Sequence, residues 1–226
     1  MEIVLETFDC PPFGENSYLV GDPARGEAAV IDPGGRVDDI VRTAALRGVT
    51  ITQILGTHSH IDHVAGVAEL QARTGAPYRL DAAAVPMLAG LPAQAARFGL
   101  PPVAPPTVDG VVRAGDRVAV GGLTLTVRAT PGHAPGHVTF VAPTVRLDGR
   151  DAPVALCGDV IFLGLIGRTD LPGGDYATLM TVIEREILSL DDDTVLLCGH
   201  GPATTVGHER RTNPFVLDWL ARHGAR

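Results

Sequence analysis

A short histidine-rich stretch constrains this chain more than any other part of its sequence. Three histidines and an aspartate occur within six residues, at His58, His60, Asp62 and His63. They follow residues 51–55, an apolar run of strand-like composition. Polar groups at the end of a buried strand lose their hydration unless a partner replaces it. The sequence therefore predicts a bound partner here, and imidazole and carboxylate groups are typical ligands of metal ions.

The spacing within this stretch favours two metal ions over one. In an extended segment alternate side chains share a face, so His58 and His60 can reach one point. Asp62 and His63 follow after the chain turns and can reach another. The alternative is a solvated histidine-rich loop, as in a purification tag, but a tag lies at a terminus and lacks a buried strand leading into it.

Two motifs carry a resemblance to a known family. Residues 58–63 match the pattern HxHxDH, and in them the chain resembles the metallo-β-lactamase superfamily. Residues 167–175 read Gly-Arg-Thr-Asp-Leu-Pro-Gly-Gly-Asp and resemble a segment of its glyoxalase II-like hydrolase branch. This resemblance covers most of the chain. It implies an α/β fold, the four-layer αββα sandwich of the superfamily, and a metal-dependent hydrolase.

The resemblance also implies the ligands of two divalent metal ions. Seven side chains would provide them: His58, His60 and His133 for the first ion, Asp62, His63 and His200 for the second, and Asp159 as a bridge between both. Asp62 and Asp159 are then also the predicted catalytic carboxylates. Nitrogen and carboxylate ligands without thiolate suit Zn²⁺ first, with Fe²⁺ or Mn²⁺ as alternatives.

Two polar residues beside these motifs have other predicted roles. His137 follows His133 in a loop rich in glycine and proline, and we expect it to lie behind the ligands or in the core. Arg168 is the candidate substrate-binding residue, because an arginine can anchor a substrate carboxylate through two parallel hydrogen bonds. A salt bridge from Arg168 to Asp170 or Asp175 is the structural alternative.

Hydrolysis of a thioester, as in hydroxyacylglutathione hydrolases, is the reaction that the resemblance implies. Two ions about 3.5–4 Å apart would acidify a shared water and polarise the thioester carbonyl. An iron-dependent persulfide dioxygenase, which would use the first site alone, and a hydrolase of another ester or a lactone stay open as alternatives. Few residues follow His200, so we expect residues 1–226 to form one hydrolase domain without the C-terminal helical glutathione-binding domain of glyoxalase II.

The amino-acid composition limits the kinds of binding partner and of chemistry that this chain can have. A formal net charge of -8 argues against nucleic acid and anionic membrane surfaces, so a small-molecule substrate is expected. All 18 basic residues are arginine, which excludes Schiff-base chemistry on a lysine. The cysteines are odd in number and scattered, and the first residues do not form a signal peptide, which predicts a cytoplasmic protein. The sequence does not indicate an oligomeric state.

Hydrophobic periodicity and turn residues predict alternating strands and helices. Strands are expected over 2–8, 17–20, 27–31, 51–55, two stretches within 111–127, 138–141, 154–157 and 194–198, and helices over 37–47, 64–74 and 176–188. Residues 81–110 form a helical excursion with a proline-rich loop, which is either a lid that faces the substrate or a packing segment.

Overall fold

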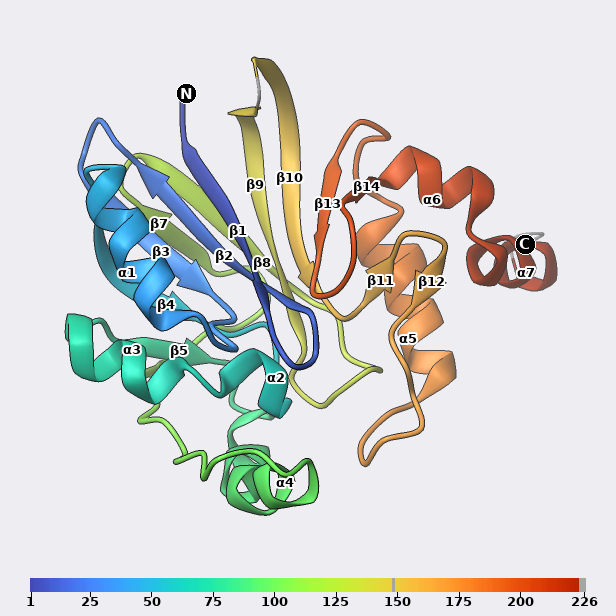
Figure 1. Ribbon diagram of the computed structural model, residues 1–226. Helices are drawn as coiled ribbons and strands as arrows, with labels where there is room; N and C mark the ends of the chain where they lie inside the picture. Colours follow the sequence, from blue (N-terminus) through green and yellow to red (C-terminus); the bar gives the residue numbers. More distant parts are fainter. Residues whose placement is uncertain (148, 224–226) are drawn as a thin grey trace.

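The computed structural model describes residues 1–147 and 149–223, and these residues form four layers. Two six-stranded sheets pack face to face in the middle, and helices cover the outer face of each sheet. Figure 1 shows α1 and α3 on one side of the sheets and α5, α6 and α7 on the other. The predicted αββα sandwich is confirmed. No helix in the described ranges is long and apolar enough to cross a bilayer.

The first sheet contains the N-terminal strands. Its order along the sheet is β1 (Val4–Cys10), β2 (Glu15–Asp22), β3 (Glu27–Ile31), β4 (Thr50–Leu55), β5 (Tyr78–Leu80) and β6 (Gly110–Val111). The first three strands run antiparallel, and β3 to β6 are parallel. Its outer helices are α1 (Val37–Leu46), α2 (Ile61–Val64) and α3 (Val67–Thr74).

The second sheet contains the C-terminal strands. Its order is β14 (Thr204–Thr205), β13 (Val195–Cys198), β10 (Arg150–Gly158), β9 (Val138–Leu147), β8 (Leu123–Ala129) and β7 (Arg117–Val120). Its outer layer contains α5 (Tyr176–Val182), a π-helical turn η2 (Ile183–Ile187), α6 (Val206–Thr212) and α7 (Pro214–His223). A small hairpin of β11 (Ile161–Phe162) and β12 (Leu165–Ile166) follows β10.

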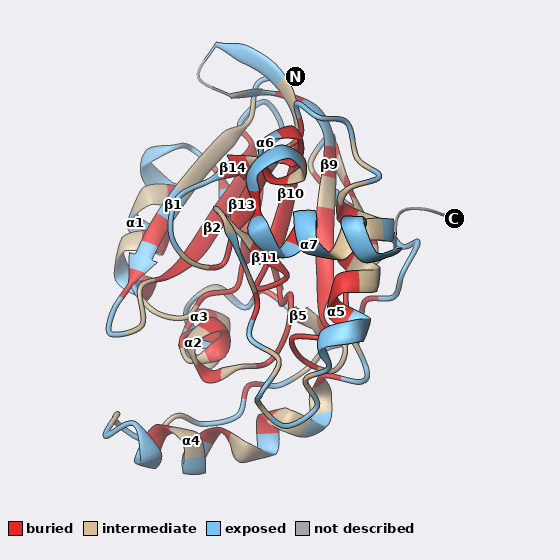
Figure 2. Cartoon of the chain, turned by 90° about the vertical axis from the view of Figure 1, so that its right-hand side faces the viewer, coloured by how far each residue is buried: buried red, intermediate tan, exposed pale blue. Residues whose placement is uncertain are grey.

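Alternation of side chains along the strands builds three apolar cores. Between the sheets, Val20 and Leu55 of the first sheet belong to one cluster with Leu125 and Phe140 of the second. The opposite faces of the strands pack against the helices on either side. Figure 2 shows buried residues concentrated on the strands, while much of α7 is exposed. Each sheet is therefore covered on both faces, and the strand ends remain available for a site.

Two predicted helices differ from the observed ones. The helix expected over 64–74 begins only at Val67, as α3, and is divided at Gly66 from the short α2, because the N–H of Gly66 donates to the carbonyl of Pro33 in the loop after β3, 2.9 Å away. A Cβ at Gly66 would lie 2.7 Å from that carbonyl oxygen, so only glycine fits. The helix expected over 176–188 is α-helical only to Val182 and continues as the π-helical turn.

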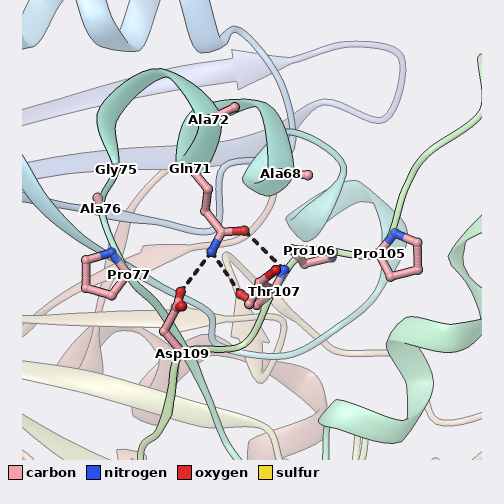
Figure 3. Close-up of a pocket in the computed structure, with 10 residues that line it drawn as sticks. All are labelled: Ala68, Gln71, Ala72, Gly75, Ala76, Pro77, Pro105, Pro106, Thr107 and Asp109. Atoms are coloured by element: carbon pink, nitrogen blue, oxygen red, sulfur yellow. Dashed lines mark hydrogen bonds between the residues drawn. The ribbon is translucent and has the colours of Figure 1, made fainter.

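The segment 81–110 packs against the first sheet and continues to the cavity described below. It contains the 3₁₀ helix η1 (Val85–Gly90) and α4 (Leu91–Arg97). Leu88, Leu91 and Ala95 belong to the core of this layer. The proline-rich loop after α4 is attached to α3 by Gln71, whose Nε2 donates to the carbonyl of Thr107 at 2.8 Å and to Asp109 at 2.9 Å (Figure 3).

The substitution Gly132→Ala tests how tightly the loop before His133 is packed. The φ of Gly132 is 122°, and a Cβ there would overlap the backbone of Leu179 in α5. Gly132→Ala adds overpacking to backbone strain, so we expect it to lower the free energy of unfolding by about 3 kcal/mol. Gly48→Ala is the matched control, since Gly48 has a φ of 69° but no atom within 4 Å of its Cβ.

The control should lose only about 1 to 2 kcal/mol, because it carries the strain alone. Denaturant unfolding measures both variants. Equal losses would show that the loop can move away from α5 without cost, which would contradict tight packing of Gly132 against Leu179.

Candidate metal centre

The structure brings all seven predicted ligand side chains to one edge of the two sheets. They come from five places: His58 and His60 after β4, Asp62 and His63 on α2, His133 after β8, Asp159 after β10, and His200 after β13. Open α/β sheets usually bind ligands at the carboxyl ends of their strands. Six of them form two groups, each compact enough to hold one metal ion, and His58 and His63 also form a further group with Asp32.

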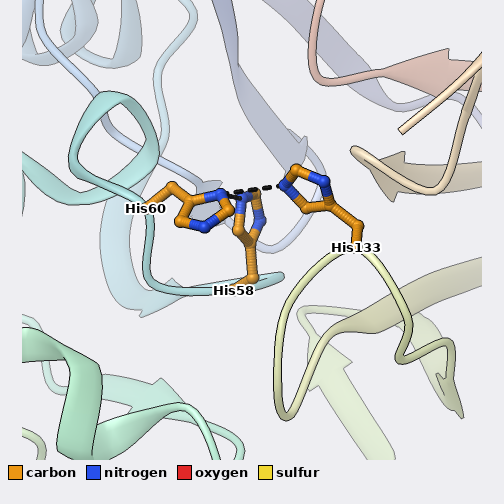
Figure 4. A group of neighbouring side chains, drawn as sticks. All are labelled: His58, His60 and His133. Carbon is orange, nitrogen blue, oxygen red and sulfur yellow. Dashed lines mark hydrogen bonds between the residues drawn. The ribbon is translucent and has the colours of Figure 1, made fainter. Parts of the chain in front are cut away.

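The first group contains three histidines whose ring nitrogens converge. Nδ1 of His60 lies 3.1 Å from Nε2 of His58 and 2.8 Å from Nε2 of His133 (Figure 4). Zinc ligands of this type bind through nitrogens about 2.0–2.1 Å from the ion. Three nitrogens this close to one another can therefore share a single cation.

Hydrogen bonds fix the protonation of two of these rings. The hydroxyl of Thr57 donates to Asp32 at 2.6 Å, so the contact of 3.0 Å between Thr57 Oγ1 and Nδ1 of His58 must be donated by the histidine. Nδ1 of His133 donates to the carbonyl of Arg168 at 2.8 Å. Both rings therefore direct an Nε2 lone pair at His60, whose single N–H cannot serve both lone pairs equally. This surplus of acceptors favours a bound cation.

The second group contains Asp62, His63 and His200. Nε2 of His200 lies 3.2 Å from Oδ2 of Asp62, and Nδ1 of His200 donates to the carbonyl of Gly14 at 3.1 Å. Nδ1 of His63 donates to Asp32 at 3.1 Å, which leaves its Nε2 facing the centre. Both histidines are again held through Nδ1 and present Nε2 to the group.

Asp159 lies between the two groups. Its Oδ1 is 3.3 Å from Nε2 of His63, and its Oδ2 is 3.6 Å from Nε2 of His133 and 3.6 Å from Nε2 of His200. Two buried atoms here, Oδ1 of Asp159 and Nε2 of His63, have no hydrogen-bond partner among the described residues. Buried polar atoms without partners are uncommon in native proteins, and ions are among the groups that satisfy them.

Burial and neighbouring charges shift the pKa values in this site. Burial lowers the pKa of His58 well below its ordinary value, and the surrounding imidazoles lower it further. Burial likewise lowers the pKa of His60, to about 4. Burial would raise the pKa of Asp159, but His63 and the other imidazoles outweigh it and lower that pKa. Neutral imidazole and ionised carboxylate, the forms that bind metal ions, thus prevail at neutral pH for these three groups.

His137 lies behind the predicted ligands, as expected from the sequence. It is fully buried, and its Nε2 accepts a hydrogen bond of 3.1 Å from the backbone N–H of Asp159. Its Nδ1 lies 2.9 Å from the hydroxyl of Thr130. His137 therefore positions the chain at Asp159 and is absent from both ligand groups.

Two buried carboxylates that were not predicted from the sequence lie behind the second group. Asp32 accepts hydrogen bonds from Thr57 and His63, and Oε1 of Glu15 lies 3.8 Å from Nδ1 of His63. Asp32 directly follows β3, so the pattern that identified Asp159, an aspartate after an apolar strand, could have found it. Glu15 follows a turn, and nothing in its sequence surroundings indicates burial.

Arg168 lies at the rim of the site and is paired with a neighbour. Its guanidinium donates two hydrogen bonds of 2.7 Å to Asp170, and its side chain is 61% exposed. The structural alternative predicted for Arg168 is thus present, and its role toward a substrate stays a prediction. The remaining histidines, His208 and His223, are exposed on α6 and α7.

A cavity of about 880 Å³ opens over both groups. Its floor includes His60, Asp62, His133, Asp159 and His200. Its walls come from the turn after β1, the segment around α4 and the hairpin β11–β12. The size is typical of pockets for small-molecule ligands.

Comparisons with known proteins agree with this geometry. Residues 10–200 match the metallo-β-lactamase superfamily. Hydroxyacylglutathione hydrolase GloC of Haemophilus influenzae is 35% identical over 219 residues, which cover 94% of this chain and 97% of that protein. The crystal structure of BLEG-1 B3 metallo-β-lactamase has a TM-score of 0.80 and 31% identity over 94% of this chain and 99% of that chain. TTHA1623, solved in a di-iron-bound form, has a TM-score of 0.77 and 33% identity over 93% and 99% of the two chains. The chain therefore belongs to the metallo-β-lactamase superfamily of metal-dependent hydrolases.

Proposed function

We propose that this metal-dependent hydrolase cleaves thioesters at a centre of two divalent ions. The observation that carries the proposal is the position of Asp159 between the two groups: its Oδ1 lies near His63 of the second group, and its Oδ2 lies equally far from His133 of the first and His200 of the second. The similarity to a hydroxyacylglutathione hydrolase supports a thioester as the substrate. The cavity over both ligand groups has the size of a pocket for a small molecule, which supports a substrate of this size.

The proposed ligands are those indicated by the sequence. They are His58, His60 and His133 for the first ion, Asp62, His63 and His200 for the second, and Asp159 for both. We propose Zn²⁺ as the metal, with Fe²⁺ or Mn²⁺ as alternatives that the same donor atoms accept. The relative solved with two irons keeps iron open for this chain.

The residues present fit such ions. Nε2 of His63 and Oδ1 of Asp159 are buried and unpaired among the described residues, and both face the second group. Two divalent ions bound here would acidify a water and polarise a thioester carbonyl. No serine or cysteine nucleophile is then required.

The chain itself positions and shields these groups. Asp32 holds His63 and, through Thr57, His58, so that each ring keeps one orientation. Asp62 and Asp159 line the cavity, where their carboxylates would help to hold the ions that acidify the water. Burial opposes ionisation of Asp62, but His63 and His200 outweigh it and lower its pKa.

We propose Arg168 as a contact for an anionic part of the substrate. It lines the same cavity, and its ion pair with Asp170 is exposed. Exposed ion pairs contribute little to stability, so Arg168 can exchange Asp170 for a substrate carboxylate at small cost.

Asp159→Asn tests the proposed bridge. The amide keeps the shape but removes the charge that offsets two dications, so we expect the metal content to fall from about two ions to about one per chain. We expect kcat for thioester hydrolysis to fall by at least about 100-fold, because the second ion is lost. Elemental analysis of protein purified without added metal and steady-state kinetics measure the two effects.

His208→Ala is the matched control, because His208 is an exposed histidine on α6 outside both groups. It should keep full metal content and activity. Full metal content and activity in Asp159→Asn would refute the bridge. A single iron in the unaltered protein, with oxygen consumption on a persulfide, would favour the dioxygenase alternative instead.

A substrate panel tests the reaction type. The cavity floor offers the polarising site, whereas its walls offer few polar contacts to a peptide-like thiol. We therefore expect S-lactoylglutathione to be hydrolysed with a high KM, since weak uniform binding raises KM and leaves kcat largely unchanged. A thioester, a lactone, a β-lactam and a phosphodiester should be compared at matched metal loading. Efficient β-lactam or phosphodiester hydrolysis without thioester turnover would contradict the proposal.

A further inference from the structure

The walls of the cavity are apolar on two opposite sides. On the side of α4 lie Met87, Phe98 and Phe13, and the rings of Phe13 and Phe98 meet edge to face with centroids 5.1 Å apart. On the side of the hairpin β11–β12 lie Phe162, Leu163 and Leu165. Phe98, Leu163 and Leu165 are 53%, 43% and 56% exposed. Large apolar side chains gathered at the edge of a site indicate a ligand that covers them.

The hairpin is held with these side chains at the cavity. Oε2 of Glu209, a fully buried carboxylate on α6, accepts a hydrogen bond of 2.9 Å from the backbone N–H of Gly164. The side chain of Asn213, also buried, donates to the carbonyl of Leu165 at 3.0 Å and to Glu209 at 2.8 Å. Both contacts fix the hairpin backbone, so the exposure of its leucines is built into the fold.

The rim offers very few charges to a ligand. Besides the proposed metal ligands, the polar side chains that line the cavity are Gln94, Arg97 and Arg168. Arg168 shares its charge with Asp170, whereas Arg97 forms no ion pair with any residue in the described ranges. The wall therefore complements one anionic group at Arg97 without loss of an existing ion pair, together with a largely apolar body.

We infer that the cavity selects thioesters whose acyl group is apolar, either an alkyl chain of medium length or an aromatic ring, and whose thiol part carries a single carboxylate. The inference rests on the proposed thioester reaction and names its substrate class. Water adds to the acyl carbon, the C–S bond breaks, and the products are the carboxylic acid and the thiol. Glutathione carries two carboxylates and an ammonium group. Its second carboxylate would have to displace Asp170 from Arg168, and its ammonium group would meet no carboxylate of the cavity lining other than the proposed metal ligands.

A series of acyl thioesters of 3-mercaptopropionate tests the selection. With metal-loaded protein, we expect kcat/KM to rise about threefold for each methylene added from acetyl to octanoyl, because each buried methylene stabilises the complex. Benzoyl thioester should also exceed acetyl thioester. A flat or falling series, or a higher kcat/KM for S-lactoylglutathione than for the octanoyl compound, would overturn the inference.

Binding of the matching S-alkyl thioethers, measured by calorimetry, separates this inference from the proposed reaction. These analogues cannot be hydrolysed, so their affinity reports on the cavity alone. If affinity rises with chain length while no thioester is turned over, the proposed reaction fails and the apolar preference stands. If affinity does not depend on chain length, the apolar preference fails whatever the turnover.

Leu165→Ser tests the hairpin wall directly. We expect kcat/KM for the octanoyl thioester to fall about tenfold and that for the acetyl thioester to change less than about twofold. Leu46→Ser is the matched control, since Leu46 is 80% exposed on α1 and is absent from the cavity lining. Identical chain-length series in both variants would exclude the hairpin as the acyl-binding wall.

Arg97→Ala tests the anionic contact. The unaltered protein should prefer thioesters of 3-mercaptopropionate over those of the isosteric amide, and Arg97→Ala should reduce this preference at least about threefold. Arg185→Ala is the control, because Arg185 is exposed on η2 and outside the cavity lining. An unchanged preference in Arg97→Ala would show that the carboxylate is bound elsewhere.

Discussion

The carboxylate of Asp159 is shared by imidazoles from three separate segments of the chain, and the site depends on this contact. His63 follows a strand of the first sheet, whereas His133 and His200 follow strands of the second. The contact therefore forms only when the two sheets pack with their strand ends at one edge. Space is also limiting, because a Cβ at Gly199 would overlap Oδ1 of Asp159 and lie 2.8 Å from Cε1 of His63.

Asp32 connects segments of the first sheet in a way comparable to Asp159. Its carboxylate accepts hydrogen bonds of 2.7 Å from the N–H of Thr57 and of 3.1 Å from His63. The end of β13 is tied to the same sheet, since the hydroxyl of Tyr18 donates to the carbonyl of Cys198 at 2.6 Å. Contacts behind metal ligands orient their rings and tune their basicity. In this chain such contacts also join the two sheets, so the site and the packing support each other.

Much of this arrangement could be predicted from the sequence, because strand ends carry local signals. Apolar runs ending in glycine and then a histidine or aspartate placed His58, Asp159 and His200 at one sheet edge, where the structure has them. Their roles as metal ligands stay a prediction. Glu15 was missed because its burial results from contacts with residues distant in the sequence.

The apolar wall of the cavity also could not be predicted from the sequence. Residues 161–166 are apolar, which is equally typical of a core strand. Their pairing with each other and their contacts with α6 and with Asn213 after it show that they form a separate hairpin. The divided helix at Gly66 has the same origin, since a distant carbonyl occupies the space that a side chain would need. Local patterns predict elements, and long-range contacts decide their ends.

X-ray absorption at the metal edge, on protein purified without added metal, tests the central claim most directly. If Asp159 joins two ions, the spectra should show a metal–metal scattering path of about 3.5–4 Å and mainly nitrogen and oxygen ligands. Absence of that path in protein with one ion per chain, or sulfur in the first coordination shell, would contradict a bridged pair of ions at this site.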